Sequence, residues 1–105
     1  MKKRGVFILF LLVFVVASVL LLGYHELAHQ AIYNKFGVDA EISFFPFGAQ
    51  TQANSSDFAE LSESDARVVN ALQAANEVYG YQIFVVLGAF FLSNFLLLLY
   101  WEAKK

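Results

Sequence analysis

The sequence predicts an all-α membrane protein: two transmembrane helices in an antiparallel pair, with a short β-hairpin-like segment and an amphipathic helix between them. Three observations indicate this. Residues 5–22 and 81–101 contain no charged side chain, and each approaches the roughly 20 residues needed to span a bilayer as a helix. Hydrophobic residues make up 59% of the 105-residue chain, above the roughly 45–50% of soluble domains. We therefore expect a single membrane domain over residues 1–105.

The distribution of charge predicts the orientation in the membrane. Lys2, Lys3 and Arg4 precede the first apolar stretch, and Lys104 and Lys105 follow the second. Between them lie two basic residues, Lys35 and Arg67, against seven acids from Asp39 to Glu77, in addition to Glu26. The positive-inside rule then places both termini in the cytoplasm and the central segment outside. Nothing in this pattern indicates nucleic acid as a partner, and the absence of cysteine excludes disulfides and cysteine-ligated metals.

The first helix is predicted to run beyond the apolar stretch, over residues 5–36. Gly37 is a good C-terminal stop, with Lys35 in the last turn. Such a helix is about 48 Å long at 1.5 Å per residue, whereas the hydrocarbon core is about 30 Å thick. His25 is therefore expected near the outer boundary of the membrane. A cleaved signal peptide is the rival interpretation, but the apolar run is long and no small-x-small cleavage site closes it.

Residues 38–57 are predicted to form loop and short strands. Ala40, Ile42 and Phe44 alternate with Glu41, Ser43 and Phe45, which suits a short strand. The Pro-Phe-Gly sequence at 46–48 predicts a turn into a second short strand, and residues 53–57 predict a loop. The first strand could pair with an extended peptide, or its phenylalanines could pack into the lipid interface.

An amphipathic helix over residues 62–79 is expected to lead into the second span. Ser62 and Asp65 form a capping box at its start. Gly80 is the expected position of a break between this helix and the second span, residues 81–101. Tyrosines and Trp101 at the two ends of that span match the aromatic belts of membrane proteins.

The stretch His25-Glu26-Leu27-Ala28-His29 matches the pattern H-E-x-x-H. Two histidines four residues apart on a helix can reach a single Zn²⁺. The glutamate beside the first histidine can then accept a proton from the water that zinc activates. The motif uses both histidines of the chain and lies at the end of a membrane helix, where ionisable groups are costly. We therefore expect His25 and His29 to be metal ligands and Glu26 to be catalytic.

The motif and the residues after it resemble the site-2 protease family of intramembrane zinc metalloproteases. The similarity covers "HELAHQAIYNKFGV", and "SNFLLLLY" in the second span resembles the Asn-Phe-Leu-Leu segment of that family. The resemblance implies that His25 and His29 bind zinc and that Glu26 is the catalytic carboxylate. The Leu-Asp-Gly motif that supplies the family's third ligand is absent, and Phe90-Phe91 replaces its Gly-Pro.

The third ligand must therefore come from elsewhere in the chain. Asn94 is polar but lies at the wrong depth in the second span, where an interhelical hydrogen bond is the better expectation. Glu77 lies at the right depth, and "NEVYG" resembles the second motif of gluzincin metallopeptidases, Asn-Glu-x-x-small, which completes a His₂Glu site. The alternative for Glu77 is a charge on the solvated face of the helix. Four other acids are less specific candidates, expected in solvated loops and helix caps: Asp57, Glu60, Glu63 and Asp65.

These features favour a zinc metallopeptidase that hydrolyses peptide bonds near the outer membrane face. Its partners would be membrane lipid and a peptide or membrane-protein substrate. Four tyrosines are candidates to assist an oxyanion, with no basis for choosing among them: Tyr24, Tyr33, Tyr79 and Tyr81. Because two spans hardly enclose a cavity, we also expect a homo-oligomer or a larger membrane complex. The alternatives are a non-catalytic subunit of that complex, with or without bound metal, and a structural two-helix protein with a coincidental motif.

Overall fold

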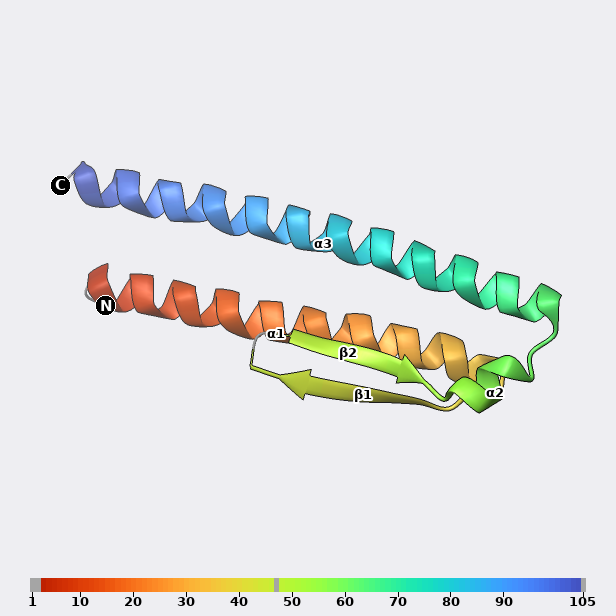
Figure 1. Cartoon of the computed structure of the whole chain (residues 1–105). Helices are drawn as coiled ribbons and strands as arrows, with labels where there is room; N and C mark the ends of the chain where they lie inside the picture. The colour runs from red at the N-terminus through yellow and green to blue at the C-terminus, as the bar shows by residue number, and fades with distance from the viewer. Residues whose placement is uncertain (1–2, 47, 105) are drawn as a thin grey trace.

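The computed structural model describes residues 3–46 and 48–104 and is mostly helical. Two long helices lie side by side in opposite directions, and a β-hairpin lies along one of them (Figure 1). The elements in chain order are α1 (Lys3–Lys35), β1 (Ala40–Phe45), β2 (Gly48–Ala53), α2 (Ser55–Ala59) and α3 (Glu63–Ala103). The predicted pair of long helices and the small two-stranded segment between them are confirmed.

Helix α1 ends as its sequence predicts. Gly37 has a positive φ of 78°, which a residue without Cβ adopts at no steric cost. Its amide donates to Asn34 O at 3.1 Å, and the amide of Val38 donates to Tyr33 O at 3.0 Å. These two bonds form a Schellman motif, which satisfies carbonyls that the end of the helix leaves free. Val38 is buried, so the chain turns back against α1 directly after the stop.

The hairpin is a two-stranded antiparallel sheet with one continuous register, from Ala40 opposite Ala53 to Phe45 opposite Gly48. It returns along the C-terminal half of α1, with β2 between α1 and β1 (Figure 1). Gln30 Nε2 of α1 donates to Ala40 O at 2.9 Å and fastens the base of the hairpin to the helix. The predicted strands and turn are present, with Phe47 of the turn outside the described residues.

Two sequence expectations about the following segment are wrong. Residues 55–59 form the short helix α2 and not a loop, because the Asn54 side chain caps it by accepting from the amide of Asp57 at 3.0 Å. Helix α3 is continuous through Gly80, since a glycine inside a helix costs only about 1 kcal/mol and need not break it. The predicted cap at Ser62 is confirmed by its bond from the amide of Asp65 at 3.1 Å.

The helices contact each other through an aromatic row in their apolar halves. The Phe14 and Phe91 rings lie 4.8 Å apart, and the Phe10 ring lies 5.2 Å from Phe91. Asn94 lies in this region of α3 but donates to Phe90 O of its own helix at 2.8 Å. The expectation of an interhelical hydrogen bond from Asn94 is therefore wrong. Its side chain donates to a carbonyl on the preceding turn of its own helix, as short polar side chains often do.

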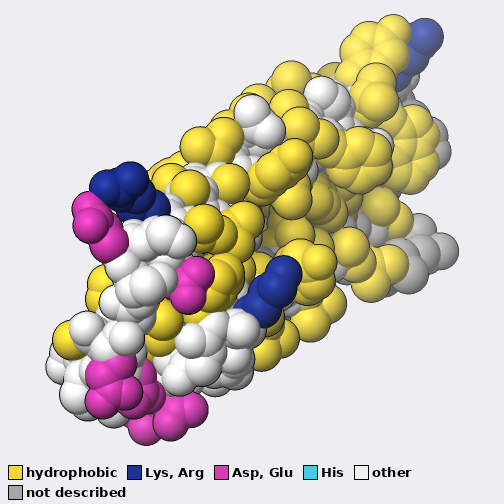
Figure 2. Space-filling view, turned by 90° about the vertical axis from the view of Figure 1, so that its right-hand side faces the viewer, with side chains coloured by type: hydrophobic (Ala, Val, Ile, Leu, Met, Phe, Trp, Pro, Cys, Tyr) yellow, Lys and Arg dark blue, Asp and Glu magenta, His cyan; other side chains and the backbone are white. Residues whose placement is uncertain are grey.

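Most apolar side chains of both helices point outward. In the most apolar 18-residue window of α1 no residue is buried, and in that of α3 only 6% are. Charged side chains gather at the end that holds α2 and the hairpin base, and hydrophobic side chains cover most of the remaining surface in view (Figure 2). Both helices are long and apolar enough to span a membrane, and their apolar surface is exposed, unlike that of a soluble core helix.

Candidate metal centre

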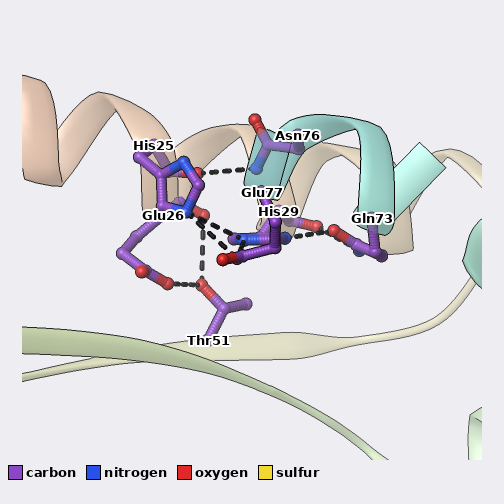
Figure 3. A network of polar contacts seen from close by, with 7 residues as sticks. All are labelled: His25, Glu26, His29, Thr51, Gln73, Asn76 and Glu77. Carbon is purple, nitrogen blue, oxygen red and sulfur yellow. Dashed lines mark hydrogen bonds and ion pairs between the residues drawn. The ribbon is translucent and has the colours of Figure 1, made fainter. Parts of the chain in front are cut away.

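Three ligand atoms from two helices converge on one point. His25 and His29 lie one turn apart on α1, and Glu77 faces them from α3. Their side chains point toward one another (Figure 3). His25 Nε2 lies 3.1 Å from Glu77 Oε1, His29 Nε2 lies 2.5 Å from the same oxygen, and the two Nε2 atoms are 3.2 Å apart. The structure thus brings together the three residues that the sequence singled out as a ligand set.

This donor set fits a tetrahedral zinc ion. Ligand atoms about 2.0–2.1 Å from zinc in tetrahedral geometry lie about 3.3–3.4 Å from one another. The separations of 3.1 and 3.2 Å are close to that value. The 2.5 Å contact between His29 and Glu77 would have to open by about 0.8–0.9 Å to match that value. Two imidazoles and one carboxylate leave a fourth position open, as in catalytic zinc sites.

Gln73 and Asn76 of α3 form hydrogen bonds with His29 and His25. His29 Nδ1 is hydrogen-bonded to Gln73 Oε1, and Gln73 Nε2 donates to His29 O at 3.0 Å. A carbonyl acceptor at Nδ1 holds a proton there, so a metal bound to His29 would be ligated through Nε2. Asn76 Nδ2 donates to His25 O at 3.2 Å. These side chains join α1 to α3 at the level of the ligands.

Gly80 gives His25 the space it occupies against α3. A Cβ built on Gly80 would lie 2.5 Å from Nδ1 and 2.6 Å from Cε1 of His25. Real Cβ atoms essentially never approach so closely. The small residue one turn after Glu77 is therefore a requirement of the helix contact.

The electrostatics of Glu77 reflect its two partners. Its side chain is 49% exposed, whereas those of His25 and His29 are 14% and 12% exposed. Partial desolvation raises the pKa of Glu77, but hydrogen bonds from His29 and His25 and their charges outweigh it. The pKa therefore lies below its usual value of 4.5. The carboxylate is ionised at neutral pH, as a metal ligand must be.

Glu26 lies beside this cluster but is not part of it. Its side chain points toward Thr51 of β2 (Figure 3), whose Oγ1 lies 2.5 Å from Glu26 Oε2 and 3.1 Å from Glu26 O. Glu26 is 6% exposed. It lines, together with His25, His29 and Glu77, one cavity of about 440 Å³. A buried carboxylate next to the ligands suits proton transfer better than ligation.

The remaining candidates lie elsewhere or have other partners. Asp57 accepts a hydrogen bond from the amide of Asp39 at 3.1 Å, and Glu63 pairs with Arg67 at 2.5 Å. Glu60 is the C-terminal cap residue of α2, and Asp65 lies in the first turn of α3. None of these four acids belongs to the group of His25, His29 and Glu77, which could hold a metal ion.

Among the tyrosines, Tyr33 and Tyr81 line the 440 Å³ cavity. Tyr24 and Tyr79 line a neighbouring cavity of about 280 Å³ on the other side of His25. The geometry therefore favours Tyr33 and Tyr81 over the other two as groups near a bound substrate.

The sequence suggested the first strand, β1, as the one that could pair with an extended peptide. In the structure β2, and not β1, contributes to this cavity, through Ala49, Gln50 and Thr51.

Sequence reasoning missed Gln73, Asn76 and Thr51 as parts of the site. For α3 a signal existed, because Gln73, Asn76, Glu77 and Gly80 follow the i, i+3, i+4, i+7 spacing of one helix face. For Thr51 no local signal exists, since its partner lies 25 residues earlier in the chain.

No protein-family model, no curated protein and no solved structure matches this chain. The likeness to site-2 proteases and gluzincins therefore rests on the short motifs alone, and the geometry of the site carries the functional argument.

Proposed function

We propose that the chain is a membrane-embedded zinc metallopeptidase that hydrolyses peptide bonds near the outer face of the membrane. One observation carries this proposal: Nε2 of His25, Nε2 of His29 and Oε1 of Glu77 converge within 3.2 Å of one another. Their cavity also holds the buried carboxylate of Glu26. Two imidazoles, a carboxylate and a separate acid are the parts that zinc hydrolases use.

The proposed membrane placement puts this site at the outer boundary. Tyr79 and Tyr81 near the site and Tyr100 at the far end are all 62–71% exposed on α3. About 20 residues of helix separate them, which is about 30 Å and matches the hydrocarbon thickness. By the positive-inside rule, the basic residues beyond both far ends support cytoplasmic termini.

The roles of the chain's own residues follow from this arrangement. Bound zinc would supply a Lewis acid for hydrolysis at neutral pH. The Glu26 carboxylate takes up the proton of the attacking water and delivers it to the leaving amine. Gln73 keeps His29 in the tautomer that directs Nε2 to the metal. Leu22 and Phe84 line the cavity towards the apolar halves of the helices and restrict access of water.

The proposed substrate is an extended peptide or a segment of a membrane protein. Strand β2 borders the cavity through Ala49, Gln50 and Thr51; β1 pairs with one of its edges, and the other edge faces α1 (Figure 1). An extended peptide beside β2 would receive main-chain hydrogen bonds. The phenylalanines of β1 suit the alternative role in the lipid interface, since Phe44 and Phe45 are 68% and 51% exposed.

The test measures zinc and hydrolysis in the same preparations. Purified wild type in detergent should hold one zinc per chain and cleave a mixture of quenched fluorescent peptides. His25→Ala and His29→Ala should lose the zinc, whereas Glu26→Gln should retain it and lose cleavage, because the carboxylate transfers protons and does not ligate. Equal zinc loss in all three variants would show that Glu26 is a ligand or a structural residue.

A non-catalytic metal-binding subunit of a larger membrane complex is the second candidate. It is favoured by the outward-facing apolar side chains of both helices, which suit packing against other membrane helices or further copies of this chain. Zinc-loaded wild type with no cleavage of any peptide, and with Glu26→Gln indistinguishable from it, would support this candidate over the peptidase.

A further inference from the structure

The buried carboxylate of Glu26 is held by a residue that no motif includes. Thr51 Oγ1 lies 2.5 Å from Glu26 Oε2. This is the length of a charge-assisted O–H···O⁻ bond, and such bonds are roughly twice as strong as neutral ones. The same hydroxyl lies 3.1 Å from the backbone oxygen of Glu26. A hydroxyl has one proton, so the shorter contact, to the carboxylate, receives it.

Helix α1 cannot orient this carboxylate by itself. Glu26 follows His25 directly, so its Cα–Cβ bond points about 100° around the helix from that of His25. Its flexible side chain has several rotamers, and burial at 6% exposure requires a partner for the charge. Among the described residues, the Glu26 carboxylate has one hydrogen bond, from the Thr51 hydroxyl to Oε2.

The hairpin supplies the partner from a fixed position. Thr51 pairs with Ile42 in the middle of the sheet, and Gln30 ties the start of β1 to α1. Thr51 and Glu26 line the same cavity as His25 and His29. One hydroxyl on β2 therefore determines where the acid sits relative to the ligands.

We propose that Thr51 is a positioning residue for Glu26. Its hydroxyl holds Oε2 and thereby leaves Oε1 as the oxygen that exchanges the proton with water in the cavity. This inference rests on the proposed peptidase function. Its consequence is that a correctly docked hairpin is needed for hydrolysis but not for metal binding, since no ligand atom lies on the hairpin.

The experiment compares three variants with the wild type. Thr51→Val keeps the shape and removes the hydroxyl, Thr51→Ser keeps the hydroxyl, and Ser43→Ala removes an exposed hydroxyl from the facing strand as a control. Zinc content, kcat and KM are measured on the mixture of quenched peptides. The ¹³C carboxyl resonance of Glu26, assigned by its loss in Glu26→Gln, is recorded in each zinc-loaded protein.

Thr51→Val should retain its zinc, lose about 10–100-fold in kcat with little change in KM, and shift the Glu26 resonance. Thr51→Ser should restore both kcat and the resonance, and Ser43→Ala should match the wild type. A purely structural role would instead lower the melting temperature and zinc content together and would leave kcat per bound zinc unchanged.

Two results would overturn the proposal: an unmoved Glu26 resonance in Thr51→Val, or an unchanged kcat in that variant while the wild type is active. If the wild type binds zinc and cleaves nothing, the proposed peptidase function fails. The resonance alone then decides whether Thr51 positions Glu26.

Discussion

Gly80→Ala tests the helix contact that forms the metal centre. The added Cβ would lie 2.5 Å from Nδ1 and 2.6 Å from Cε1 of His25. Favourable heavy-atom contacts are about 3.5–4.0 Å, so the His25 ring or helix α3 must move by about 1 Å. The ring cannot move freely, because its Nε2 faces Glu77 and His29.

The size of the expected loss in zinc affinity follows from the narrow range of zinc–ligand distances. Ligand distances hold within about 0.2 Å, so a shift of about 1 Å separates His25 Nε2 from the other two donors. We expect a loss of about 10–100-fold in zinc affinity, comparable with other disturbances of groups that orient ligands. Alanine also has a higher helix propensity than glycine by about 1 kcal/mol. Helix stability and zinc affinity should therefore change in opposite directions.

The assay is zinc competition against a chromophoric chelator in detergent, with helix content followed by circular dichroism during heating. Gly23→Ala and Gly88→Ala are matched controls, because a Cβ at either position meets nothing within 4 Å. Both should bind zinc like the wild type. A Gly80→Ala protein with unchanged affinity would refute the close packing of His25 against α3, and with it the geometry of the site.

Four further predictions concern the candidate metal centre and the membrane topology. Glu77→Gln should weaken zinc binding by more than about 100-fold, and Gln73→Leu by about 10–100-fold through loss of the His29 tautomer, both by chelator competition. In metal-free protein, the pKa of Glu77 is lowered in the folded state, so the Glu77 carboxylate stabilises the fold above about pH 4.5. This stabilisation is lost as the pH falls through the pKa of the folded protein. The difference in melting temperature between wild type and Glu77→Gln should therefore shrink as the pH is lowered over this range. Single cysteines at Ser55 and Lys105 should be labelled from opposite sides of the membrane; labelling of position 55 from the cytoplasm would reverse the topology.

The sequence was sufficient for features that depend on local chemistry. Gly37 marks the end of α1 and Ser62 the start of α3, because a glycine with positive φ and a capping hydroxyl act within one turn of helix. The depth of Glu77 also followed from the sequence, since antiparallel helices of known rise place it at the level of His25 and His29, but its facing the histidines stayed one of two alternatives. Depth, however, does not give the rotation of α3 about its axis.

That rotation and register decide the rest of the site, and they follow from the whole facing stripe of α3. His25 lies against Gly80, and Phe14 and Phe10 lie against Phe91 and Phe95 in the same register. A slip of one turn, about 5.4 Å, would set the histidine ligands against a differently polar part of α3. Glu77 would then lose both imidazole partners, and the aromatic row would lose its pairing. In a single register of the two helices, the polar face of α1 contacts the polar face of α3 and the aromatic side chains of α1 contact those of α3. The contacts that bury apolar surface therefore also bring the three ligand atoms together.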